Sequence, residues 1–409
     1  MSLAAVCPDC TPFTDLLQVH RDGRLVLQPN VHPLPDLLGR DAESVLSAFM
    51  DMQRADFSQV ITQLKGDGRL HGLLADLRRV ADGEPGNPFG ALPLFRDGAL
   101  EAMFEELHAH VMAHPVWRHP FFLRVFEGRF DQAQLTRFAL HYFNQVKNTR
   151  QCVALSLGRF STALDLPFGG VNERVMEMVQ IVLAQLIADE YGVDQQTDET
   201  DLAGLLQSTT HIVMYRQLFE GLGVPYGEQD VPMLPAVADN VLTQRLVAGH
   251  PAFSAMESLA SVGLGMEWGV PEFFSLLLGG MIRFAQREDV PLTRRHLHVF
   301  IAHVEADVMH AIAVMAVTAL LATDDDAVER IKGATNTLMA SRYGMMSGLY
   351  REVFGEDCAK LADIDLAPAY RLRDRRIADA LLAARRALPA RAVTDPSYRE
   401  STALPFVFA

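Results

Sequence analysis

The most informative stretch of the chain is His303-Val-Glu-Ala-Asp307-Val-Met-His310. Residues 303, 307 and 310 are spaced i, i+4 and i+7, so a helix places their side chains along one stripe. The flanking residues are apolar, and polar groups on a buried helix face are costly unless something satisfies them. Two imidazoles and a carboxylate aimed at one point suit a divalent transition metal, particularly iron or manganese. The alternative is a solvated stripe, or core histidines that are hydrogen-bonded to their neighbours.

Helical spacing of apolar residues extends far on both sides of this octapeptide. It is found in segments 97–112, 132–160, 171–190, 210–222, 236–247, 253–265, 271–287, 294–322 and 325–353. We find no convincing alternating strand and no repeat of fixed period between 97 and 355. Residues 96–355 are therefore predicted to form an all-α helical bundle.

Two flanking regions differ from this central part. Residues 1–95 predict a mixture of short helices and irregular chain, with oligomerisation as one interpretation of their role. Segment 83–93 carries three prolines and three glycines, which marks a domain boundary. Residues 356–409 predict an Arg-rich amphipathic helix over 370–387 and an irregular tail.

Composition excludes several classes of protein. The 409 residues include 36 Lys and Arg against 51 Asp and Glu, which gives a formal net charge of −15. This balance argues against binding to nucleic acid or to an anionic membrane surface, since both favour a basic face. No apolar run reaches the roughly 18 residues of a membrane span, and the N-terminus lacks a signal-peptide pattern. A cytoplasmic protein is expected.

The four cysteines are too few and too scattered for a disulfide framework. Cys7 and Cys10 form a single Cys-x-x-Cys with no second pair close by. A reduced, mobile terminus is the preferred interpretation, and a zinc or redox role is the alternative.

Three more side chains are candidate ligands beside the octapeptide. Glu190 closes an otherwise hydrophobic helix, and Glu267 lies in an apolar segment rich in small residues. His211 opens a Leu/Phe-rich helix. A two-metal site needs carboxylates from several helices, so the two glutamates fit that requirement. Each of the three residues could instead be an ordinary helix-end residue.

The order of these features resembles the haem-oxygenase-like diiron oxidases. It runs Asp189-Glu190-Tyr-Gly, His211, Glu267 and then His-x-x-x-Asp-x-x-His, and segments 114–122 and 134–142, with Asn148, resemble the opening helices of that family. The resemblance covers roughly 105–320 and implies a haem-oxygenase-like helical bundle. It also implies that two Fe²⁺ per chain are bound by Glu190, His211, Glu267, His303, Asp307 and His310.

The chain departs from the family pattern between the first glutamate and its histidine, which usually lie close together on one helix. Here Glu190 and His211 are separated by an acidic insertion that contains Asp194, Asp198, Glu199 and Asp201. Either His211 still reaches the site, or another group replaces it. One inserted carboxylate could also be an additional ligand.

The resemblance implies a non-haem diiron oxygenase that uses O₂ as co-substrate and an external electron donor. Substrates of such proteins are amines, amino acids or fatty acids, and the outcomes are N-oxygenation to hydroxylamine or nitro groups, desaturation or carbon–carbon cleavage. We expect a homodimer that acts on a small metabolite in natural product biosynthesis. Candidate substrate contacts lie in a polar band, and they are His141, Tyr142, Gln145 and Arg150.

Two other classes stay open. One is a metal-free enzyme with the same helical architecture, resembling thiaminase II or a cofactorless oxygenase. A thiaminase-like enzyme needs a nucleophilic cysteine, and Cys152 is the only one within the bundle. The other class is a non-enzymatic helical interaction protein whose histidines and acids satisfy one another.

Overall fold

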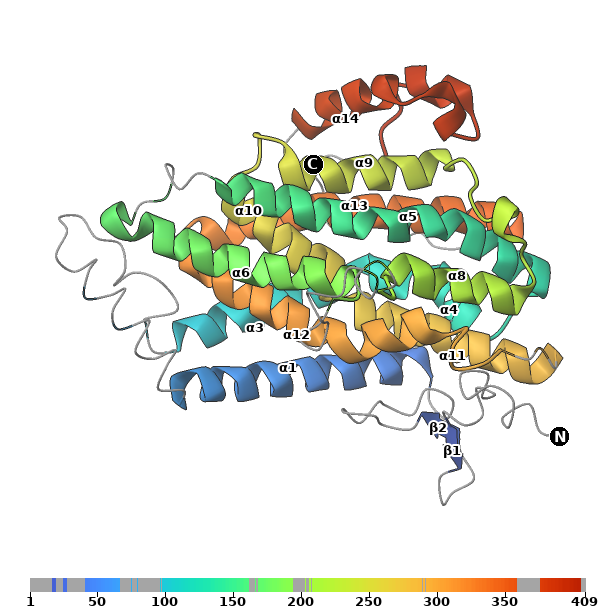
Figure 1. Cartoon of the computed structure of the whole chain (residues 1–409), viewed down its shortest axis with the longest axis horizontal. Helices are drawn as coiled ribbons and strands as arrows, with labels where there is room; N and C mark the ends of the chain where they lie inside the picture. Colours follow the sequence, from blue (N-terminus) through green and yellow to red (C-terminus); the bar gives the residue numbers. More distant parts are fainter. Residues whose placement is uncertain are drawn as a thin grey trace.

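The structure, a computed structural model, describes residues 17–19, 25–27, 41–66, 75, 79, 96, 98–161, 166, 168–193, 203, 206, 208–288, 290, 292–358 and 376–405. Within residues 98–358 the described chain is a bundle of helices without a regular strand (Figure 1). The predicted all-α class is confirmed. Cys7, Cys10 and the predicted boundary at 83–93 lie outside the described residues.

The long elements, in chain order, are α1 (Ala42–Gly66), α3 (Ala99–Met112), α4 (Pro120–Phe126), α5 (Gln132–Gly158), α6 (Asn172–Glu190), α8 (His211–Leu222), α9 (Pro235–Gly249), α10 (Ala255–Ala260), the π-helix η10 (Ser261–Glu267), α11 (Val270–Glu288), α12 (His298–Leu321), α13 (Ala327–Phe354) and α14 (Arg376–Ala387). Short 3₁₀ turns cover η6 (Pro115–Arg118), η7 (Arg159–Ser161), η8 (Gly169–Val171), η9 (Tyr226–Glu228), η13 (Ala390–Ala392) and η14 (Pro396–Glu400).

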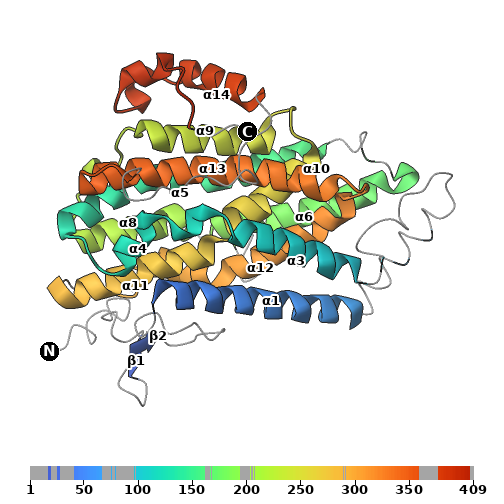
Figure 2. The same ribbon diagram turned by 180° about the vertical axis from the view of Figure 1, so that it is seen from behind.

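The helices are stacked in layers. Helices α5, α9 and α13 pack against one another, and α14 covers α9 on the outside. On the opposite side α11 packs against α4 and α12, and α1 runs along α11 and α12 (Figures 1 and 2). Helix α12 also contacts α6, α8 and η10, so its stripe is surrounded by other helices. No helix of the described chain is long and apolar enough to cross a membrane.

The N-terminal region contains one element that helical periodicity did not indicate. Strands β1 (Leu17–Val19) and β2 (Leu25–Leu27) pair antiparallel, with Leu17 opposite Leu27. The sequence between them contains Asp22-Gly23, a dipeptide typical of hairpin connections. Three-residue strands are too short for an alternating pattern to stand out, so this region is not purely helical or irregular.

Helix ends agree closely with the expected segments except around Glu267 and at the start of α12. The expected helix over 253–265 is α10 followed by a π-helix, in which the N–H of Trp268 donates to the oxygen of Gly263 at 2.9 Å. Helix α12 begins at His298 rather than at 294, because residues 293–296 form a turn in which Thr293 N–H donates to His296 Nδ1. The expected helix over 370–387 is observed as α14, and residues 370–375 lie outside the described chain.

Candidate metal centre

The first two predicted ligands come from the facing ends of α6 and α8. Glu190 is the last residue of α6, and His211 is the first residue of α8. Gly192 has a left-handed φ of 65°, and a Cβ there would lie 2.5 Å from the backbone oxygen of Thr209. The chain therefore leaves α6 and enters α8 at neighbouring points. As a result His211 Nδ1 lies 3.2 Å from Glu190 Oε2, although the residues are far apart in sequence.

The proximity of Glu190 and His211 answers whether the insertion between them keeps His211 away from the cluster. The side chain of Thr210 accepts a hydrogen bond from the N–H of Val213, so Thr210 caps α8 and fixes where His211 begins. The geometry matches the first of the two alternatives, in which the insertion leaves His211 at the site. The four inserted carboxylates lie outside the described residues.

Glu267 reaches the site from the end of η10. A Cβ on Gly263 would collide with the side chain of Val314, so this segment packs directly on α12. Gly265 packs in the same way against Leu338 of α13, where a Cβ would lie 3.0 Å from Cδ2. The small residues therefore allow the close helix contact that they predicted. The wider π turn directs Glu267 inward, where it is 5% exposed, and such turns are frequent at functional sites.

Helix α12 carries His303, Asp307 and His310 on one face, as their spacing predicts. The Nδ1 atom of His303 lies 2.9 Å from Asp307 Oδ2, and Nδ1 of His310 lies 3.5 Å from Asp307 Oδ1. Asp307 is 1% exposed, and both histidine side chains are largely buried. The stripe therefore faces the interior of the bundle and not the solvent.

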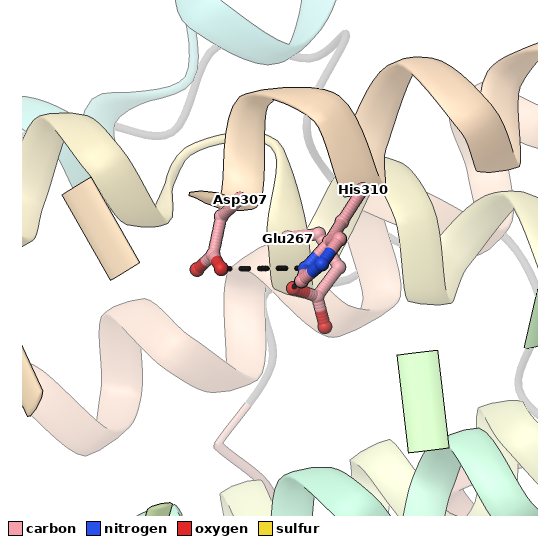
Figure 3. A group of neighbouring side chains, drawn as sticks. All are labelled: Glu267, Asp307 and His310. Atoms are coloured by element: carbon pink, nitrogen blue, oxygen red, sulfur yellow. Dashed lines mark ion pairs between the residues drawn. The ribbon is translucent and has the colours of Figure 1, made fainter. Parts of the chain in front are cut away.

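All six predicted ligands belong to one continuous cluster. The ring of His211 meets that of His303 edge-on at 4.5 Å between centroids. At the other end, His310 Nδ1 lies 4.0 Å from Glu267 Oε2. Glu267, Asp307 and His310 each offer a ligand atom within 4.8 Å of one another (Figure 3). Four separate elements thus bring three carboxylates and three imidazoles together.

Burial and mutual charge shift the ionisation of this cluster strongly. Burial, together with the negative charge of Asp307, raises the pKa of Glu267 to about 8. Burial opposes protonation of the two histidines, but Asp307, with the charges of Glu190 and Glu267, outweighs it and raises the pKa of His303 to about 9. Hydrogen bonds to Asp189 and Asp307 likewise raise the pKa of His310 to about 11. Without a cation, protons on the imidazoles balance the carboxylates, so a metal must displace them.

The residues present fit a divalent-metal centre. Within the described chain, the buried Asp307 Oδ2 and His211 Nδ1 atoms make no hydrogen bond of good geometry, despite their nearby ionisable neighbours. Three carboxylates with neutral imidazoles carry three negative charges, which complements two divalent cations. A mixed oxygen and nitrogen donor set of this kind suits iron or manganese.

Asp189 contacts the cluster, although sequence reasoning assigned it no role. Its Oδ2 atom lies 2.9 Å from Nε2 of His310, the ring nitrogen opposite the one that faces Asp307 and Glu267. Its Oδ1 atom accepts a hydrogen bond from Gln185. A carboxylate that holds the outer nitrogen fixes the tautomer and orientation of a ligand histidine. Its position beside Glu190 was the available signal, but a helix normally turns adjacent residues to different faces.

Glu272 of α11 is a second residue that sequence reasoning did not single out. Its side chain is fully buried, and neither carboxylate oxygen hydrogen-bonds to another described residue. Burial raises the pKa of Glu272 to about 8, and the charge of nearby Asp307 adds to the shift. A lone glutamate within the apolar run 270–282 was the signal that could have found it.

The four predicted substrate contacts are placed differently from one another. His141 Nε2 lies 3.9 Å from Glu352 Oε1, and the Arg150 guanidinium lies over the ring of Tyr191. The amide of Gln145 is held by two buried polar side chains, Gln244 and Asn240. Tyr142 approaches the ligands through one intervening ring, because it contacts Phe274, and Phe274 contacts His303.

The cysteines of the described bundle lack the environment of a nucleophile. Burial raises the pKa of Cys152 to about 12, opposite to the activation that a nucleophilic thiol needs. Cys358 Sγ lies 3.4 Å from Nε2 of His119. However, His119 Nδ1 accepts the N–H of Phe121, so Nε2 carries the proton and cannot take one from the thiol.

Comparisons with known proteins add little beyond the helical architecture. No protein-family model matches the chain, and neither does any curated protein. Two solved structures align with 62% of it, each at 11% sequence identity. A TenA homologue from Pseudomonas syringae aligns over 93% of its own length with a TM-score of 0.45, and a CADD-like protein of unknown function from Nostoc punctiforme over 98% with a TM-score of 0.46. Likeness at this level carries no argument about activity.

Proposed function

We propose that this chain is a non-haem diiron oxygenase that uses O₂ to oxidise a small amine or amino-acid-like metabolite. The observation that carries the proposal is the buried convergence of three carboxylates and three imidazoles from α6, α8, η10 and α12. Two ferrous ions bound there would supply the electrons that reduce dioxygen. We further propose an external electron donor and a homodimeric assembly. N-oxygenation, desaturation and carbon–carbon cleavage are the candidate outcomes.

In this reaction the protein would hold and orient the metal ligands, and it would exclude water from them. Asp189 orients the ring of His310 through its outer nitrogen. Phe274 packs 5.0 Å from the ring of His303, and Phe300 packs against Phe274 at 5.1 Å, so an aromatic wall borders the ligands. Such a wall keeps bulk water from the reacting groups.

No observation favours the metal-free alternative to the same degree. A thiaminase-like mechanism needs an activated thiol, and burial deactivates Cys152. A purely structural cluster is the remaining alternative. It gives no account of the buried Asp307 Oδ2 and His211 Nδ1 atoms, which make no hydrogen bond in the described chain.

The test is to add ferrous iron anaerobically to metal-stripped protein and to measure bound iron per chain. The expected result is close to two irons in the wild type and a marked loss in His310→Ala. His250→Ala is the matched control, because His250 lies at the end of α9 and only caps a turn through Nδ1. This variant should bind iron as the wild type does.

Oxygen is then admitted and the visible spectrum is followed. A transient absorbance that forms in wild type and in His250→Ala, but not in His310→Ala, supports the proposal. Background iron in all three well-folded proteins would show that the cluster is a packing feature.

A further inference from the structure

Arg342 of α13 is a buried cation without a partner of its own. Its side chain is 4% exposed, and its Nη1 atom has no hydrogen-bond partner in the described chain. Its only hydrogen bond there is a long one, 3.5 Å from Nη2 to the backbone oxygen of Met266. No carboxylate of the described residues lies within ion-pairing distance of it. A guanidinium stays protonated even when burial lowers its pKa, so the site holds a positive charge that no ion pair in the described chain neutralises.

The surroundings of Arg342 place this charge beside the candidate metal centre. Met266, which accepts the long hydrogen bond, directly precedes the predicted ligand Glu267, and the charge of Glu267 acts on the guanidinium. The rings of Trp117 and Phe273 flank the guanidinium at 6.0 and 5.4 Å from their centroids. These aromatic neighbours are good surfaces for a planar cation but supply no negative charge.

Tyr142 of α5 is a second donor in the same place. Its side chain is 4% exposed, and its hydroxyl makes no hydrogen bond with any residue of the described chain. Its ring packs against Phe273, which also contacts the Arg342 guanidinium. The positive charge of Arg342 acts on the phenol. Since no described residue accepts its proton, this hydroxyl can donate to a group placed beside Arg342.

A buried guanidinium nitrogen without a hydrogen bond, with a phenol hydroxyl nearby, favours an anionic acceptor. Glu267 cannot serve once it holds a metal, because its charge is then shared with the cation. A planar carboxylate matches the guanidinium fork, and it can also accept from a phenol.

We propose that Arg342, assisted by the Tyr142 hydroxyl, binds the carboxylate group of the substrate and thereby positions the rest of the molecule at the Glu267 side of the metal centre. The site then takes amino acids or fatty acids and rejects simple amines. This inference rests on the proposed function, since it assumes that the reaction occurs at the cluster around Glu267.

The test is calorimetric titration of the full-length protein, loaded anaerobically with ferrous iron. The probes are the proteinogenic L-amino acids, the amines made from them by decarboxylation, and straight-chain fatty acids. At least one carboxylate should bind, and its decarboxylated or ester counterpart should bind at least about 30-fold more weakly. Preference within the panel distinguishes an amino acid from a fatty acid.

Variants assign the recognition to Arg342. Arg342→Met should lower the affinity for that carboxylate by about 30-fold or more, Arg342→Lys should retain part of it, and Tyr142→Phe should cost a smaller factor. Arg330→Met is the matched control on α13, because Arg330 pairs with Asp324 at the surface. It should bind the probe as the wild type does, and all four variants should bind iron normally.

Two results would overturn the inference. One is equal binding of a carboxylate and its decarboxylated counterpart, or no binding by any carboxylate. The other is unchanged affinity in folded Arg342→Met. Repeating the titration on metal-free protein separates this failure from that of the proposed function. Arg342-dependent carboxylate binding without any iron binding would remove the diiron assignment and leave the carboxylate site.

Discussion

Two buried arginines of this protein differ in how far their hydrogen-bond donors are satisfied. Arg385 of α14 is 1% exposed and fully satisfied: Nε and Nη2 bind both oxygens of Asp239 at 2.8 Å. Its Nη1 atom donates to the backbone oxygens of Ser401 and Ala403. Arg342 of α13 is 4% exposed, yet it has one long hydrogen bond and no ion pair in the described chain. The hydrogen-bond donors of Arg385 are satisfied within its own chain, whereas Arg342 keeps donors that could bind a ligand.

The buried polar groups near these arginines also differ in how fully they are hydrogen-bonded. Between α5, α9 and α13 a neutral network pairs most of its polar atoms: Asn240 donates to Gln145 and Ser341 donates to Asn240, while the amide nitrogen of Gln244 makes no hydrogen bond in the described chain. The cluster around Glu267 instead collects like charges and atoms without hydrogen bonds. Single unpaired atoms occur elsewhere in the described chain too, but unpaired atoms that lie together with buried charges favour a binding role.

The comparison is tested most strongly by removing the satisfied arginine. Arg385→Met leaves Asp239 buried without its countercharge, and burial already raises the pKa of that carboxyl. We expect the free energy of unfolding to fall by about 3–5 kcal/mol, measured by urea denaturation. Iron binding should be unchanged in the folded fraction. Arg386→Met, at an exposed position on the same helix, is the control and should change stability by less than about 0.5 kcal/mol.

The sequence predicted the bundle because apolar periodicity over long helices is a strong signal, and α12 followed it closely. It also predicted the six residues that now form one cluster, since unusual polar residues in apolar helices stand out. It could not predict Asp189 as the partner of His310, because that contact joins distant segments. Arg342 was equally hidden, because a single arginine in a mixed helix such as α13 is usually solvated. The π-helix at Glu267 spans 7 residues, too few for its own period to stand out in the sequence.

The second-largest expected effect is a loss of iron affinity when the contact between Asp189 and His310 is removed. Asp189→Asn keeps the size of the side chain but removes the charge that holds Nε2. We expect iron affinity to fall about 10–100-fold, measured by competition with a chelator. Asp189→Glu should recover part of the affinity. Gln185→Ala, which removes only the hydrogen bond to the other oxygen of Asp189, should have a smaller effect. Unchanged affinity in Asp189→Asn would mean that this carboxylate has no positioning role.

A pH series on metal-free protein tests the unsatisfied cluster as a whole. Burial raises the pKa of Glu267 and of Glu272 to about 8, and the pKa values of His303 and His310 rise to about 9 and about 11. The folded state thus binds more protons than the unfolded chain between about pH 5 and 9. Stability should therefore fall with rising pH in this range, by at least several kcal/mol.

The lowered pKa of Asp307 has the opposite sign but acts only below about pH 4, outside this window. Urea denaturation at several pH values measures the decline. Loading with Fe²⁺ should flatten it, because the metal replaces the protons as the source of positive charge. An equally steep decline in loaded protein would show that the cation is not bound among these groups.

The smallest expected effect is the change in stability on Arg342→Met, which contrasts directly with that on Arg385→Met. In metal-free protein without ligand, Arg342 has no countercharge at ion-pairing distance in the described chain, and Glu267 is largely protonated near neutral pH. Arg342→Met therefore removes a desolvated charge and keeps most of the packing against Trp117 and Phe273. The free energy of unfolding should change by less than about 1 kcal/mol, or should rise slightly. A loss as large as that of Arg385→Met would mean that Arg342 stabilises the fold. A small change combined with lost carboxylate binding would mean that its positive charge is kept in the core for a ligand.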